Sequence, residues 1–154
     1  MSQAFSGYGL YVELGNNDGS TSPFVAETFS AISEVQMVDF TGSKVDLVDV
    51  THAQSPNARR EYIATLIDDG EMTFTANFIP GDLTQTGLQT VYSNRAVRDW
   101  RVLLPGATSP STVGPLGEFT FSGIVTSIDH GLPFDKEAKL SVKVKITGQL
   151  LFTP

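Results

Sequence analysis

The chain of 154 residues contains no cysteine, few basic residues and no long apolar run. Without cysteine, a disulfide scaffold, a thiolate metal site and a cysteine nucleophile are excluded. Lys and Arg number 10 against 17 Asp and Glu, and this net charge of −7 argues against a protein that grips the phosphates of DNA. No segment could span a membrane, and the N-terminus MSQAFSGYGL has no basic-then-apolar pattern of a secretory signal.

Motifs of common enzyme families are missing as well. The chain has no G-x-S-x-G, P-loop, G-x-G-x-x-G or H-E-x-x-H pattern. His52 and His130 are the only histidines, and both fall in expected loops far apart in sequence, which disfavours a metal pair or a catalytic base. Asp68 and Asp69 are adjacent on a turn and point apart, which disfavours acid–base chemistry. We therefore expect no enzymatic activity, no catalytic residue, no metal site and no cofactor.

The residues that are present indicate a single β-rich domain spanning residues 1–154. The length suits one domain with a sizeable core, and 14 Gly and 8 Pro supply many turns. The clearest strand is Glu71–Ile79, in which apolar and polar side chains alternate strictly. Alternation with period two predicts one dry and one wet face. The dry face holds Met72, Phe74, Ala76 and Phe78.

Several further segments read as strands and are separated by clusters of turn residues. In the segment Glu27–Phe40 one face is expected to hold the apolar side chains and the other the polar ones. The apolar face would hold Phe29, Ala31, Val35 and Met37, and the polar face Thr28, Ser30, Glu34 and Gln36. Gly123 is expected to mark a bulge, because the apolar residues around it do not share one parity. The strand-like segments are Tyr8–Leu14, Glu27–Phe40, Lys44–Val50, Arg98–Leu104, Glu118–Asp129 and Lys139–Leu151, and the main turn clusters are Gly15–Pro23 and Pro105–Gly117.

One helix is predicted, over Gly81–Ala96. Asp82 is a suitable N-cap, and Gln85 stands three residues later as its capping-box partner. A narrow apolar stripe follows, made of Leu88, Val91 and Tyr92. The predicted fold class is therefore mainly β: a β-sandwich or barrel of about seven strands with one flanking α-helix.

The segment Val48–Phe78 carries a resemblance to a known family. It holds Asp49-Val50-Thr51, a polar loop, Arg60-Glu61 and a Leu66-x-Asp68-x-Gly70 turn, and then enters the alternating strand. This order resembles the tail tube (major tail) proteins of long-tailed bacteriophages. The resemblance covers most of the chain, including the central helix and the closing long hairpin.

The resemblance implies a structural protein of the virion. Six subunits would form a ring, and rings would stack into a hollow tube through which DNA passes during ejection without specific binding. The implied partners are further copies of the chain and the tape measure, tail tip and tail terminator proteins, with no membrane involved. The implied location is the phage tail, after synthesis in the host cytoplasm.

The resemblance also assigns roles to particular residues. It places Thr51–Leu66 at the contact between rings and Gly81–Ala96 on the tube exterior. Arginine suits bidentate pairing with carboxylates of an adjacent subunit. The residues expected at the inter-ring contact are Asp49, Thr51, Arg59, Arg60 and Glu61.

The wet face of the alternating strand is expected to line the lumen, through Glu71, Thr73, Thr75 and Asn77. A basic row on the last strand, Lys139, Lys143 and Lys145, sits poorly with a bore that repels DNA. Two explanations stay open. Glu71, Glu118 and Asp129 on neighbouring strands offset these charges, or the lysines pair across subunits.

Two other functions remain as alternatives. A ring protein of a secretion tube would share the same fold. A monomeric ligand- or carbohydrate-binding β-domain would need an aromatic platform, for which Tyr8, Tyr11 and Trp100 are the candidates, although these aromatics stand mostly at core-like positions.

Overall fold

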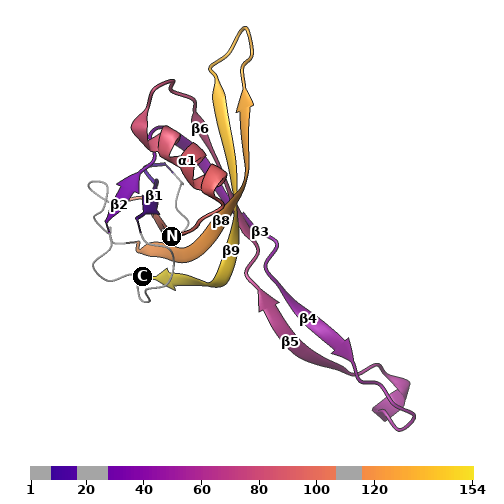
Figure 1. Cartoon of the computed structure of the whole chain (residues 1–154). Helices are drawn as coiled ribbons and strands as arrows, with labels where there is room; N and C mark the ends of the chain where they lie inside the picture. The colour runs from indigo at the N-terminus through magenta and orange to yellow at the C-terminus, as the bar shows by residue number, and fades with distance from the viewer. Residues whose placement is uncertain (1–7, 17–27, 107–115) are drawn as a thin grey trace, which may run out of the picture.

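Nine strands and one α-helix make up the described part of the chain in a computed structural model (Figure 1). The structure describes residues 8–16, 28–106 and 116–154, so most of the turn clusters predicted at Gly15–Pro23 and Pro105–Gly117 lie outside it. Seven strands form one antiparallel sheet in the order β2-β1-β7-β8-β9-β6-β3, and β4 and β5 form a separate pair. The strands are β1 Tyr11–Gly15, β2 Phe29–Ala31, β3 Val35–Thr41, β4 Lys44–Asp49, β5 Tyr62–Asp68, β6 Glu71–Asn77, β7 Val97–Leu103, β8 Glu118–Gly131 and β9 Lys139–Thr153.

The core lies on one face of this sheet, where β6 and β9 lie side by side. β6 alternates as predicted, and Met72, Phe74 and Ala76 are fully buried. Facing residues of the other strands complete the cluster, so that Trp100 stacks parallel to Phe121 with ring centroids 6.5 Å apart. The mainly β fold class predicted from the sequence is confirmed.

Helix α1, Leu83–Asn94, covers this core face and buries Leu88 and Val91. Asp82 is the N-cap as predicted, because its carboxylate accepts hydrogen bonds from two amides of the first turn. The predicted capping box is wrong. The Gln85 side chain instead accepts from the amide of Ile79 at 2.9 Å and donates to the carbonyl of Asn77 at 2.8 Å. Gln85 therefore attaches the helix to the sheet.

The run predicted over Glu27–Phe40 is two strands at opposite edges of the sheet. β2 pairs with β1 and β3 pairs with β6, and a turn with Glu34 at φ 54° separates them. A register shift between Val35 and Met37 then reverses the expected facing, so Met37 is 49% exposed while Val38 packs against the core. The prediction that Val35 and Met37 share one face is wrong, because the bulge between them changes the parity of the strand.

The long strands β8 and β9 form the largest paired element, and they contain two register shifts. Gly123 lies between the two shifts in regular pairing with Ile146, so the bulge predicted at this glycine is misplaced. A Cβ atom at Gly123 would lie 2.6 Å from Cγ1 of Val144 and 2.9 Å from the carbonyl of Lys145. Gly123 is thus required by close approach and not by a bulge. His130, expected in a loop, lies within β8 and contacts the edge of Phe78.

The pair β4–β5 extends away from the body as a long arm (Figure 1). We use "the arm" for β4, β5 and the connecting residues 50–61, which include a short 3₁₀ turn at Pro56–Ala58. The arm continues the β3–β6 pair, because Thr41 pairs with Glu71 and, after a turn, Lys44 pairs with Asp68. Six residues of strand at roughly 3.4 Å each give the paired part a length of about 20 Å.

Candidate assembly surfaces

The end of the arm is organised by the residues of the Asp-Val-Thr motif. The Asp49 carboxylate accepts the amide of Thr51 at 2.9 Å, and hydrogen bonding from Thr51 lowers the pKa of Asp49. The Thr51 hydroxyl in turn accepts the amide of Glu61 at 2.9 Å, and the amide of Val50 donates to the carbonyl of Glu61 at 2.9 Å. Asp49, Thr51 and Glu61 therefore close the loop and fix its shape.

The Glu61 side chain also points back into the loop. Its Oε2 accepts the hydroxyl of Ser55 and lies 3.7 Å from Nε2 of His52. The amide of His52 donates to the Ser55 hydroxyl at 3.0 Å, which completes a small polar network. Glu61 thus organises the loop from within, whereas the sequence assigned it only to a contact with another subunit.

Arg59 and Arg60 differ from their neighbours in the loop. Both are exposed, and neither guanidinium has a hydrogen bond or ion pair with any other described residue. Each guanidinium presents several donors in a planar fork that matches a carboxylate. Of the five residues predicted for the inter-ring contact, these two remain available to a partner.

The strands of the arm expose apolar side chains that sequence reasoning missed. A two-stranded hairpin without a covered face is at best marginally stable in water. Leu66 and Ile67 are 74% and 71% exposed, although both belong to the apolar run of β5. The sequence did contain one signal: apolar residues stand at both odd and even positions of β5, so they cannot all face a single core. The exposed apolar residues of the arm are Val45, Leu47, Val48, Val50, Tyr62, Ile63, Leu66 and Ile67.

The second surface is the polar face of the sheet on the side opposite α1 and the core. On this face, β6 carries the four residues predicted for the lumen. All four side chains are half-buried between β3 and β9. Glu71 stands opposite Lys145, Thr73 opposite Lys143 and Asn77 opposite Lys139. The sequence thus predicted correctly which side chains share this face. The assignment of the face to a lumen stays a prediction.

Most of the basic character of this face is cancelled within the chain. Nζ of Lys145 lies 2.6 Å from Oδ1 of Asp68, and this hydrogen bond is the main cause of the lowered pKa of Asp68. Lys139 pairs with Glu137 at 2.8 Å. Among the described residues, the Lys143 ammonium has no hydrogen-bonding or ion-pair partner. Ion pairing inside one subunit accounts for two of the three lysines.

Glu118, which one of the two open explanations placed in that offset, pairs elsewhere. Its carboxylate lies 3.6 Å from Nε of Arg101, and Arg101 also contacts the fully buried Glu13 at 2.5 Å. Burial raises the pKa of Glu118, and the charge of Arg101 opposes this shift. The cluster lies between β1, β7 and β8, where it ties neighbouring strands together.

The aromatic platform of a ligand-binding domain is not formed as expected. Trp100 is fully buried in the core, whereas Tyr8 is 91% exposed, so the two cannot share one surface. Asp68 and Asp69 bind different partners, Lys145 and the amide of Leu150. Within the described ranges, no group of three or more His, Asp or Glu side chains is placed to hold a metal ion.

A comparison with models of known protein families shows to which family the chain belongs. Residues 11–153 match the family model described as the lambda phage tail tube protein. The chain belongs to this tail tube family. The protein is therefore a structural component of a virion tail, as the order of motifs in Val48–Phe78 indicated. No curated protein matches the chain by sequence.

Solved structures with the same fold are themselves parts of tails and injection devices. The tail of an empty gene transfer agent particle, computed with helical refinement and C6 symmetry, is 21% identical, with 98% of this chain and 100% of that chain covered and a TM-score of 0.71. The SPP1 tail tube is 14% identical, with 96% and 78% covered and a TM-score of 0.65. The sheath–tube complex of the extracellular contractile injection system PVC is 11% identical, with 98% and 92% covered and a TM-score of 0.68. At these identities the likeness shows the fold alone.

The part of the tail tube protein that the structure describes contains no helix both long and apolar enough to cross a bilayer.

Proposed function

We propose that this tail tube protein closes into hexameric rings that stack into a hollow tube, through which DNA passes during ejection. The arm supports this proposal most directly, because eight of its large apolar side chains, seven on β4 and β5 and Val50 just after β4, are exposed in a single copy. Exposed apolar surface of this kind marks a site of association. Six copies per ring is the number favoured by the fold shared with the C6-symmetric gene transfer agent tail.

Two free strand edges support ring closure. β3 ends the sheet at one side, and β7 pairs with β8 only as far as Ile124, so residues 125–131 of β8 have β9 as their single neighbour among the described strands. Free edges invite pairing with another chain. The strands β8, β9, β6 and β3 alternate in direction, so β3 of a second copy would lie antiparallel to β8. Repeating this contact around a ring removes both edges, as barrel closure does.

The polar face of β6 and β9 would line the bore of such a barrel. Helix α1 packs on the opposite face of the sheet and would then lie on the tube exterior. Glu71, Thr73, Thr75 and Asn77 give the bore hydroxyl, amide and carboxylate groups that hydrate well and do not attract phosphate. With Lys139 and Lys145 paired inside the subunit, Lys143 is left as the one ammonium of this row without a partner among the described residues.

The arm would make the contact between rings. Asp49, Thr51 and Glu61 hold the loop in shape, and Arg59 and Arg60 are presented to carboxylates of a subunit in the next ring. The tape measure, tail tip and tail terminator proteins are the further partners we propose. A tube of a contractile injection system shares the fold, but the family match over residues 11–153 favours a phage tail.

Electron microscopy of the purified protein in negative stain tests the proposal. Wild-type protein should form hollow rings or tubes at high concentration, alone or after addition of a tail tip complex. The double variant Arg59→Ala/Arg60→Ala should form rings of normal diameter that stack poorly. Arg95→Ala, which removes an exposed cation at the end of α1, serves as the control and should stack normally. A strict monomer under all these conditions contradicts the proposed function.

A further inference from the structure

A second segment projects from the body away from the arm, and the contact proposed for the arm gives this segment no role. The β8–β9 hairpin extends beyond the rest of the sheet, on the opposite side of the body from the arm (Figure 1). At its turn Phe134 is fully exposed and Leu132 is 69% exposed. We call residues 132–136, which include Leu132, Phe134, Asp135 and Lys136, "the hairpin tip". This phenyl ring lies in water at the end of a long hairpin and is not covered by its own chain.

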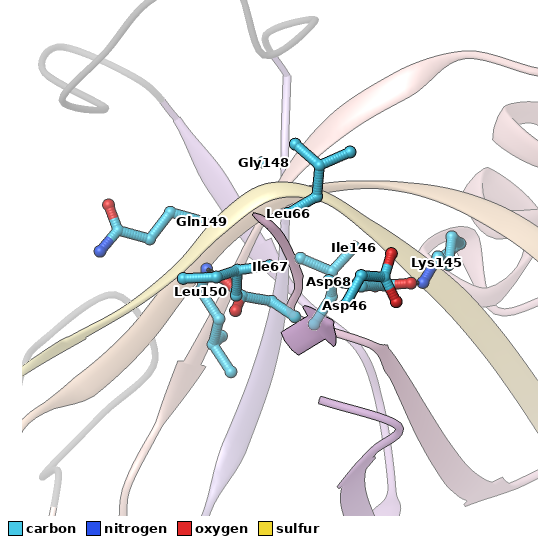
Figure 2. A pocket seen from close by; sticks show the side chains of 10 residues that line it. Asp46, Leu66, Ile67, Asp68, Lys145, Ile146, Gly148, Gln149 and Leu150 are labelled. Atoms are coloured by element: carbon cyan, nitrogen blue, oxygen red, sulfur yellow. Dashed lines mark hydrogen bonds and ion pairs between the residues drawn. The ribbon is translucent and has the colours of Figure 1, made fainter. Parts of the chain in front are cut away.

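A pocket of matching character lies at the root of the arm. It has a volume of about 680 Å³, within the range of pockets that hold small organic molecules. Figure 2 shows Leu66, Ile67, Ile146 and Leu150 around it, with Asp46 and Asp68 toward one side. We call this "the arm-base pocket". It combines apolar walls with the carboxylates of Asp46, Asp68 and Asp69 and the ammonium of Lys145, which suits an apolar side chain with a charged group nearby.

We propose that the hairpin tip of one copy inserts Phe134 into the arm-base pocket of a copy in the next ring. This inference rests on the proposed stacking of rings and adds a second, separate contact to it. The arm points toward one neighbouring ring, so the tips of that ring point back toward the place where the arm begins. Both contacts therefore belong to the same ring-to-ring interface.

The geometry of the two ends favours a second copy of the chain as the occupant. Tip and pocket are different surfaces on one molecule, so their contact is heterologous. A heterologous contact between elements at opposite ends repeats without closing, and it generates a filament. This is the symmetry that stacked rings require. The fold is shared with a tail that was refined with helical symmetry.

The charges at the two surfaces allow one specific ion pair. Phe134 is followed by Asp135 and Lys136, so the tip carries both signs, and Lys136 is its group that a pocket carboxylate would attract. On the tip, Glu137 is paired with Lys139, whereas the ammonium of Lys136 has no partner among the described residues. In the pocket, Asp68 is paired with Lys145, and Oδ2 of Asp69 accepts the amide of Leu150. Asp46 is held only by an exposed contact of 3.9 Å with Lys44. Asp46 is thus the carboxylate best placed to receive Lys136.

Assembly of a tip variant gives the first test. Phe134→Ser should leave ring formation unchanged and raise the critical concentration for tubes by about tenfold or more, the effect of losing a central anchor. Leu83→Ser removes another highly exposed apolar side chain, 86% exposed at the start of α1, and should have no effect. Light scattering against protein concentration measures both. Tubes of Phe134→Ser that form at the wild-type concentration overturn the inference.

Charge exchange identifies the pocket as the partner. Lys136→Asp and Asp46→Lys should each weaken stacking, and the double variant should recover it, because the ion pair is restored with its charges exchanged. If the double variant stacks no better than the single variants, Asp46 is not the partner of Lys136.

Cross-linking tests the contact directly, because the natural chain contains no cysteine. Oxidised tubes of the double variant Phe134→Cys/Ile67→Cys should give a ladder of covalent oligomers on a non-reducing gel. The pair Leu83→Cys/Ile67→Cys should give none. Normal tubes without a ladder from the first pair refute the tip contact and leave the proposed function intact. Wild-type protein that never forms rings or tubes refutes the proposed function itself.

Discussion

Gly70, the last residue of the Leu66-x-Asp68-x-Gly70 turn, should tolerate no side chain, and the structure gives two reasons. Its φ is 83°, in the left-handed region. A Cβ atom there would lie 2.1 Å from the carbonyl oxygen of Thr41 and 2.8 Å from the amide of Ser43, both in the backbone. The chain passes from β5 into β6 at Gly70, directly beside its passage from β3 into β4. Gly70→Ala therefore perturbs the root of the arm.

The two effects can be given magnitudes. A left-handed conformation costs a residue with a Cβ atom about 1–2 kcal/mol. Forcing the backbone around Ser43 apart adds about 1–3 kcal/mol, by analogy with overpacked cores. The free energy of unfolding should fall by about 2–5 kcal/mol, and Tm by about 4–20 °C for a chain of this size.

Gly81→Ala is the matched control, because Gly81 has the same φ of 83° and nothing within 4 Å of its Cβ position. It should lose only the conformational part, about 1–2 kcal/mol. Urea denaturation of unassembled subunits, followed by circular dichroism, measures both variants. Equal losses for the two would refute the argument that close approach of the backbone at Thr41 and Ser43 dictates this glycine.

Three further predictions concern other parts of the fold. Asp82→Ala removes the carboxylate that accepts two amides of α1, and should cost about 1–2 kcal/mol in urea denaturation. The hydrogen bond from Lys145 lowers the pKa of Asp68, so the ion pair stabilises the fold at pH values above the unfolded-state pKa. This stabilisation is lost as the pH falls through the lowered, folded-state pKa. Asp68→Asn should therefore flatten the decline of Tm between about pH 5 and pH 2. Gly123→Ala should destabilise by about 1–3 kcal/mol, because the new methyl would meet Val144 and the Lys145 carbonyl, whereas Gly131→Ala, with its nearest atom at 3.9 Å, should be close to neutral by the same assay.

The parts of the fold that are set by local periodicity were predictable. The facing of β6 follows from strict alternation between Met72 and Phe78, and the start of α1 follows from Asp82. The segment Glu27–Phe40 was not predictable, because its two halves belong to opposite edges of the sheet. The positive φ of Glu34 and the bulge before Met37 have no clear mark in the sequence.

The candidate assembly surfaces were also predictable only in part. Sequence order placed Arg59 and Arg60 on a polar loop, and the structure leaves both side chains available. It could not indicate that Thr51 and Glu61 bind each other, because a hydrogen bond across a loop depends on how the two strands of the arm are paired. The hairpin tip was missed because phenylalanine is typical of a core, and nothing in the sequence around Phe134 shows that this side chain is exposed.

The sequence by itself determined the β-rich class, the single helix, the absence of thiol chemistry and the family, because composition, periodicity and short motifs are local properties. Tertiary structure alone decided which apolar residues remain exposed. Leu66 and Phe134 look like core residues in the sequence, and only the projection of the arm and of the β8–β9 hairpin from the sheet leaves them in solvent. Burial depends on what lies opposite a side chain in space, which local sequence does not encode.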